Sequence, residues 1–133
     1  MTSTRILVQT TEVPVRWGDM DALGHVNNTS YFRYMEEARI AWMDDVLARA
    51  GPFPGEGQYI VNASCTFHLP IVYPATVEVR MYLGAQGRSS IDSHYDLDVA
   101  GRNYAEGAAK IVWVDYKAQR SAPLPQRLLA LYC

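Results

Sequence analysis

The chain has few of the residues that build metal centres or disulfide frameworks. Its 133 residues include two cysteines and three histidines, and neither type has the spacing of a zinc site. Cys65 lies inside an alternating strand pattern and is expected to be a buried structural thiol, whereas Cys133 is terminal. His68 and His94 fall on the polar faces of predicted strands, where ordinary exposed or interfacial residues occur. The sequence therefore predicts no metal site.

Excess charge of one sign, basic clusters and long apolar runs are also missing. The formal net charge is -2 and no cluster of Lys and Arg occurs, which argues against nucleic acid as a partner. No apolar run approaches the roughly 20 residues that cross a bilayer. The start of the chain lacks the basic and apolar regions of a signal peptide. We expect a cytoplasmic protein with no membrane partner.

The rest of the composition is that of an ordinary globular protein, with 49% hydrophobic and 20% charged residues. A chain of this length can bury a core, and neither a repeat nor a low-complexity linker divides it. We therefore expect a single domain over residues 1–133.

A first strand and one long helix are predicted in the N-terminal part. Val13, Val15 and Trp17 alternate with polar residues, as in a half-buried strand. From about Asn28 to Ala50, apolar residues recur instead at steps of three and four, which is typical of an amphipathic helix. The predicted buried stripe consists of Tyr31, Tyr34, Met35, Ala38, Trp42 and Val46. The Gly- and Pro-rich segment 51–57 should end the helix.

A run of strands follows, because the apolar period becomes two over residues 59–69, 77–83, 91–99 and 109–113. Segments 85–88 and 100–103 resemble hairpin turns, so most of the sheet should be antiparallel. Several strands are apolar on both faces, which indicates a sheet covered on both sides or a strand at an interface. We expect an α+β fold in which the sheet curls around the helix.

The segment from Asp19 to Asn28 is the most informative part of the chain. It reads Asp19-Met-Asp21-Ala-Leu-Gly24-His25-Val-Asn27-Asn28 and runs directly into the predicted helix. A helix N-terminus leaves backbone N–H groups unpaired and carries a partial positive charge. An ionised carboxylate beside such donors can cleave an acyl bond. Without further information, a turn or cap aspartate remains the alternative.

From Asp19 to Arg39 the pattern DxDxxGHVNNxxYxxYxExAR resembles that of the hot-dog-fold thioesterases, in particular the 4-hydroxybenzoyl-CoA thioesterase and acyl-CoA thioesterase group. The likeness continues through segments 73–79, 87–90 and 114–125. It implies a hot-dog fold, an antiparallel curved sheet of about five strands wrapped around one long central helix. It also implies hydrolysis of acyl-CoA thioesters to free acid and CoA, with no metal or organic cofactor.

The resemblance implies a catalytic site around Asp21, which would attack the thioester carbonyl as a nucleophile or activate water as a general base. The backbone N–H of Asn28 would polarise that carbonyl. Gly24, His25 and Asn27 complete the predicted oxyanion and substrate site. Gly24 would allow a special conformation or a close approach. His25 would protonate the leaving thiolate, or else organise the loop by hydrogen bonding to Asn27 or a carbonyl.

Further residues are assigned to coenzyme binding and to the pocket wall. Arg88, Ser89 and Ser90 form a turn that in the family meets the phosphates of CoA, although such turns are also common on surfaces. One protomer of this fold does not close its own pocket, so the resemblance implies a homodimer or homotetramer. Residues expected in the core or the pocket wall are Tyr31, Tyr34, Leu23, Val26 and Tyr59.

Charged residues near the motif are expected to have mainly structural roles. Asp19 would shape the loop or pair with Arg16. Glu36 and Arg39 would pair on the helix or across an interface, and Glu36 and Glu37 are reserve catalysts.

Three other functions are alternatives for such a chain. A non-catalytic acyl-CoA-binding module would not need the acid at position 21. An acyl-carrier-protein thioesterase shares the His-Val-Asn-Asn form of residues 25–28. A hydratase or dehydratase would need a His–Asp pair spaced for proton transfer, for which the sequence has no convincing equivalent.

Overall fold

The computed structural model describes residues 4–132, so Cys133 lies outside the described part. Five long strands and one long helix dominate it. The elements in chain order are β1 (Ile6–Pro14), the 3-10 helix η1 (Trp17–Asp19), α1 (Asn28–Ala50), β2 (Glu56–Phe67), β3 (Thr76–Gln86), β4 (Ser90–Val99), β5 (Arg102–Asp115), β6 (Arg120–Ser121) and α2 (Gln126–Leu129).

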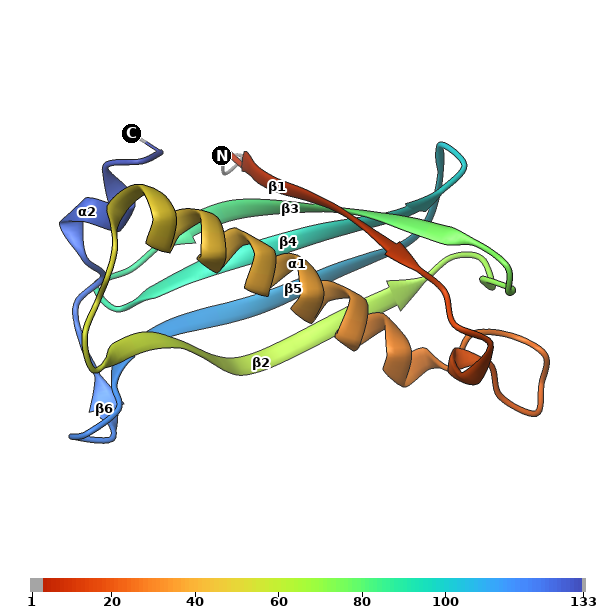
Figure 1. Cartoon of the computed structure of the whole chain (residues 1–133), viewed down its shortest axis with the longest axis horizontal. Coiled ribbons are helices and arrows are strands. Elements are labelled where there is room, and N and C mark those ends of the chain that lie inside the picture. Colours follow the sequence, from red (N-terminus) through yellow and green to blue (C-terminus); the bar gives the residue numbers. More distant parts are fainter. Residues whose placement is uncertain (1–3, 133) are drawn as a thin grey trace.

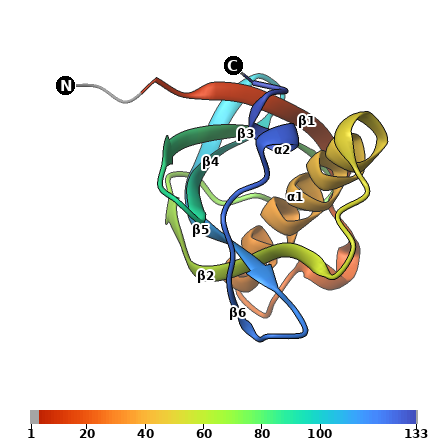
Figure 2. The same cartoon turned by 90° about the vertical axis from the view of Figure 1, so that its left-hand side faces the viewer.

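The strands form one antiparallel sheet in the order β1-β3-β4-β5-β2, with the short β6 added to β5. The sheet curves around α1, which crosses its concave face (Figures 1 and 2). This arrangement confirms the predicted hot-dog architecture. The turns after β3 and β4 are hairpin connections, as the sequence indicated.

The helix buries the predicted stripe against the concave face, and all six of its residues belong to the core. The helix ends at Gly51, where the predicted Gly- and Pro-rich segment begins. Arg39 is buried as well, and this overturns its expected pairing with Glu36 inside the chain. Its guanidinium lies 5.7 Å from the centroid of the Tyr95 ring and donates a hydrogen bond of 3.4 Å to the Tyr95 hydroxyl.

The first strand lies earlier in the chain than its alternating pattern predicted. Val13 and Val15 are buried, but Trp17 belongs to η1 and its side chain is 77% exposed. The ladder with β3 ends at Pro14, which has no N–H to donate. The chain then turns towards α1, so the alternation no longer determines which side faces the core.

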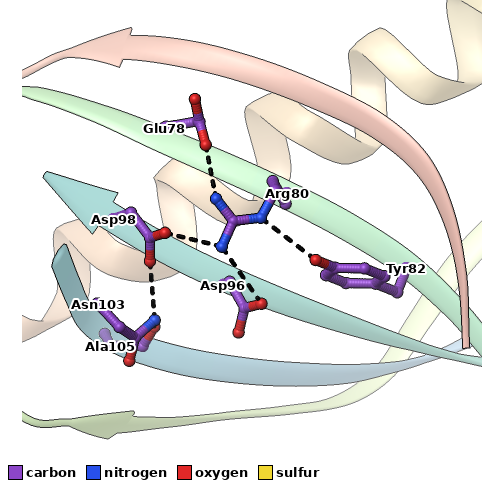
Figure 3. Close-up of polar contacts among 7 residues, drawn as sticks. All are labelled: Glu78, Arg80, Tyr82, Asp96, Asp98, Asn103 and Ala105. Carbon is purple, nitrogen blue, oxygen red and sulfur yellow. Dashed lines mark hydrogen bonds and ion pairs between the residues drawn. The ribbon is translucent and has the colours of Figure 1, made fainter. Parts of the chain in front are cut away.

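On β3 and β4 the convex face of the sheet carries polar side chains, and the long helix lies against the concave face. Arg80 lies at the centre of a cluster that joins β3 and β4 (Figure 3). Its guanidinium lies 2.6 Å from Glu78 Oε1 and 2.7 Å from Asp98 Oδ2, and it donates a 3.2 Å hydrogen bond to the Tyr82 hydroxyl. The hydrogen bonds to Tyr82 and Asp98 raise the pKa of Arg80.

Strand β2 differs from the other long strands because none of its 12 residues is buried. One edge of β2 pairs with β5, and no strand of the described residues covers the other edge. Tyr59, Val61 and Phe67 are large apolar residues exposed along it. Within residues 4–132, no helix is long and apolar enough to span a membrane.

Candidate active site

The loop before α1 is a small ribbon held by its own backbone. The N–H of Asp21 donates to the carbonyl of His25 over 3.0 Å, and the N–H of Asn27 donates to the carbonyl of Asp19 over 2.9 Å. Gly24 turns the ribbon with φ +84, and no heavy atom lies within 4 Å of where its Cβ would be. The left-handed backbone, rather than a close approach, therefore explains the glycine.

The carboxylate of Asp21 is fixed at both oxygens. Oδ1 accepts a hydrogen bond of 2.9 Å from the N–H of Leu23, and Oδ2 accepts one of 3.0 Å from the side-chain amide of Asn27. Asn27 is also the N-cap of α1, because its side-chain oxygen accepts from the N–H of Thr29 over 2.9 Å. One carboxamide thus ties the orientation of the acid to the start of the helix.

Asn28 is the first residue of α1. None of the hydrogen bonds among residues 4–132 uses its backbone N–H. The first N–H groups of a helix have no partner within the helix, and the helix dipole adds partial positive charge there. The first backbone N–H of α1 therefore has no partner among the described residues.

Asp21 and Asn28 line one open hollow of about 350 Å³. The loop and the start of α1 form one side, and the end of β2 with the segment after it forms the other. Its lining residues are Asp21, Leu23, His25, Val26, Asn28, Tyr31, Phe67, His68, Leu69 and Pro70. Among the predicted site residues, Gly24 and Asn27 support the loop without lining the hollow.

Sequence reasoning missed the wall formed by residues 67–70. These residues reach the loop because the N–H of Val26 donates to the carbonyl of Ile71 over 2.8 Å. Leu23 and Val26 line the hollow as expected, whereas Tyr59 does not line it within one protomer. Tyr59 lines another hollow together with Tyr116 and Arg120. Tyr59 is opposite Val112 of β5, and it lies eight residues before Phe67, the β2 residue that lines the hollow.

The three histidines have different surroundings, and His25 and His68 both line the hollow. The His25 ring has no hydrogen bond among the described residues, and its backbone carbonyl, not its imidazole, organises the loop. His68 lines the hollow, and its Nε2 lies 2.9 Å from Glu106 Oε2 on a polar sheet face. Burial is the main cause of a lowered pKa at His94.

Asp19 shapes the loop, as predicted. Its Oδ2 accepts hydrogen bonds from the backbone N–H of Arg16 over 3.0 Å and from the Tyr34 hydroxyl over 2.8 Å. The contact with Arg16 uses the backbone and not the guanidinium. Burial and the hydrogen bond to Asp19 raise the pKa of Tyr34. Both Tyr34 and Tyr31 are buried core residues, and Tyr31 also lines the hollow.

The two reserve acids lie outside the hollow. Glu37 lines a separate space of about 140 Å³ with Arg16 and Arg33, and Glu36 is exposed on α1. Cys65 is free and half-buried, and burial raises the pKa of its thiol to about 11. Among residues 4–132, no group of three or more His, Cys, Asp or Glu is arranged to hold a metal ion.

The turn of Arg88, Ser89 and Ser90 lies at the opposite end of the molecule from the Asp21 loop (Figure 1). The carbonyl of Ser89 accepts from the N–H of Trp113 over 2.7 Å, which fixes the turn on β5. Arg88 lines a hollow of about 400 Å³ that Arg120 shares. Arg120 therefore lies beside the turn that was predicted to bind CoA.

Comparisons with known proteins show the family to which the chain belongs. The profile of the Thioesterase-like superfamily matches residues 15–131. The chain therefore belongs to this superfamily, and the predicted thioesterase class is confirmed. No curated protein matches the chain.

Solved structures show the same fold. The PA2801 protein of Pseudomonas aeruginosa, a proposed thioesterase, is 41% identical, with a TM-score of 0.87 over 96% of this chain and 99% of that chain. A thioesterase from Thermus thermophilus, solved with coenzyme A and zinc, is 29% identical, with a TM-score of 0.80. The match covers 93% of this chain and 90% of that chain. The gentisyl-coenzyme A thioesterase BH1999 is 25% identical, with a TM-score of 0.80. The match covers 91% of this chain and 99% of that chain.

Proposed function

We propose that this protein hydrolyses acyl-CoA thioesters to the free acid and CoA, with the carboxylate of Asp21 as the catalytic group. The observation that carries the proposal is that Asp21 and Asn28 line the same hollow. The carboxylate is held by Leu23 and Asn27, and the N–H has no partner among the described residues. Similarity to thioesterases, one of them solved with coenzyme A, supports the choice of substrate.

In the proposed reaction, an Asp21 oxygen attacks the thioester carbonyl carbon. Negative charge develops on the carbonyl oxygen and is stabilised by the N–H of Asn28 and the helix dipole. The tetrahedral intermediate expels the CoA thiolate and leaves a mixed anhydride on Asp21, which water hydrolyses to release the acid and restore the carboxylate. If Asp21 acts as a general base, the same geometry directs water at the carbonyl carbon.

The free edge of β2 supports a homodimer. An exposed, apolar edge strand pairs readily with another strand. If two β2 strands pair antiparallel, the Phe67 end of one copy meets the Glu56 end of the other. Glu56 is opposite Asp115, and Asp115 pairs with Arg120. The pairing would therefore bring Arg88 and Arg120 of the second copy towards the Asp21 hollow, where two guanidinium groups suit the phosphates of CoA.

Thiol release from a panel of acyl-CoA esters tests the activity and the role of Asp21 together. Replacing Asp21 by Asn keeps the shape but removes the charge, so we expect kcat to fall by about 10³-fold or more. Asp44→Asn, an exposed position on α1, is the matched control and should behave as the parent.

Three other outcomes of this assay would contradict the proposal or change part of it. Activity that survives Asp21→Asn would refute Asp21 as the catalytic residue. Binding of acyl-CoA without thiol release would favour the binding module. Release only from acyl-carrier-protein thioesters would change the carrier but not the chemistry.

A further inference from the structure

The ring of Tyr31 forms the floor of the hollow beside Asp21. Tyr31 comes one helical turn after Asn28, so it lies about 4.5 Å further along the axis at a rise of about 1.5 Å per residue. Its side chain is 3% exposed. Burial raises the pKa of its hydroxyl. An acyl chain whose carbonyl oxygen meets the Asn28 N–H therefore reaches this ring within a few carbons.

The opposite side of this floor is closed by Phe67, the last residue of β2. The rings of Phe67 and Tyr31 meet edge to face, with centroids 4.8 Å apart and an interplanar angle of 86°. This is a favourable arrangement of two aromatic rings. Phe67 is 44% exposed, so its ring is supported on one side only. A change at Phe67 can therefore alter the hollow without opening the core.

We propose that Phe67 determines the length of the acyl group, so that the enzyme accepts short-chain and single-ring acyl-CoA esters and excludes long chains. The inference rests on the proposed hydrolysis at Asp21. The hollow of about 350 Å³ holds about twelve water-sized groups at roughly 30 Å³ each. A benzoyl group and its thioester sulfur fit this space, whereas a palmitoyl chain does not. Leu23 and Val26 provide an apolar wall for such groups.

The test compares kcat/KM for butyryl-, benzoyl- and palmitoyl-CoA in the parent, Phe67→Ala and Val72→Ala. Val72 is 49% exposed and does not line the hollow, so it is a matched control. In the parent, butyryl- and benzoyl-CoA should be preferred. A difference of one methylene in an apolar pocket already changes kcat/KM by about tenfold. Phe67→Ala should therefore raise the palmitoyl-to-benzoyl ratio at least about tenfold, and Val72→Ala should leave it unchanged.

A second measurement separates this inference from the proposed function. Dissociation constants for the non-hydrolysable thioethers S-benzyl-CoA and S-hexadecyl-CoA report acyl selection without any bond cleavage. The same shift of the ratio in Phe67→Ala is expected there. A folded Phe67→Ala protein with the parent's ratio in this assay would overturn the role of Phe67. A parent that binds both thioethers equally would also overturn it. Failure of thiol release alone would count only against the hydrolysis.

Discussion

Two neighbouring carboxamides at the start of α1 are used in different ways. The side chain of Asn27 connects Asp21 to the first turn of the helix. Asn28 supplies a backbone N–H, for which its own side chain is not needed. The proposed chemistry therefore depends on one side chain and on one main-chain group next to it in the sequence.

Replacing Asn28 by Pro removes this main-chain donor with little structural change. Proline is well tolerated at the first position of a helix. The preceding Asn27 already has φ -61 and ψ 139, the extended conformation that a following proline requires. We expect kcat to fall by about 10²–10³-fold, the effect of losing one oxyanion donor, with little change in the melting temperature.

Asn28→Ala is the matched variant, because it keeps the N–H and removes only the side chain. It should retain most of the parent's kcat, because the proposed donor is the main-chain N–H, which alanine keeps. Equal losses in the two variants would contradict the role of the backbone donor. Thiol release under saturating substrate measures both.

At the scale of elements, β3 and β4 are joined on the convex face by the Arg80 cluster. Asp98 is 8% exposed. Besides Arg80, it accepts a hydrogen bond of 2.9 Å from the side-chain amide of Asn103. Removing the guanidinium would leave this buried carboxylate with a single donor among the described residues. The cluster is therefore expected to stabilise the hairpin.

We predict that Arg80→Ala lowers the free energy of unfolding by about 1–3 kcal/mol, the cost of leaving a buried polar group poorly satisfied. Arg49→Ala is the control, because its pair with Asp45 is an exposed i, i+4 bridge on α1. Such a pair contributes about 0.3–0.5 kcal/mol. Urea denaturation of the two variants should show this difference, and equal losses would refute it.

At the scale of the whole molecule, the loop before α1 and the turn between β3 and β4 lie at opposite ends of one chain (Figure 1). The loop contributes Asp21 to one hollow, and the turn contributes Arg88 to the hollow that it shares with Arg120. The open edge of β2 runs between them. A twofold axis across this edge would combine the acid of one copy with the arginines of the other. Assembly and coenzyme binding are therefore coupled in the proposal.

Val61→Lys tests this assembly. Val61 is 50% exposed on β2, and charged residues on an edge strand oppose strand pairing. We expect a monomer by sedimentation, with KM for acyl-CoA raised by about tenfold or more, because losing one charge-assisted contact costs about 1.5–3 kcal/mol. Val72→Lys, at 49% exposure and outside the edge, should keep the parent's oligomeric state. A dimeric Val61→Lys protein would contradict pairing through β2.

The sequence by itself determined the parts that depend on local periodicity. The three- and four-residue spacing identified the buried stripe of α1, and the period of two with its turns identified the antiparallel strands. The segment from Asp19 to Asn28 also carried its own geometry, because its turn, its N-cap and its glycine act over a few residues.

Only the tertiary structure decided which distant residues meet. It placed Phe67 against Tyr31, Arg39 against Tyr95 instead of Glu36, and Tyr59 outside the hollow. Periodicity states which face of an element is buried, but the register between strands also depends on the geometry of the turns that join them. The contacts that shape the hollow and separate it from Arg88 depend on this register and on the curvature of the sheet, and both arise only when the whole chain packs together.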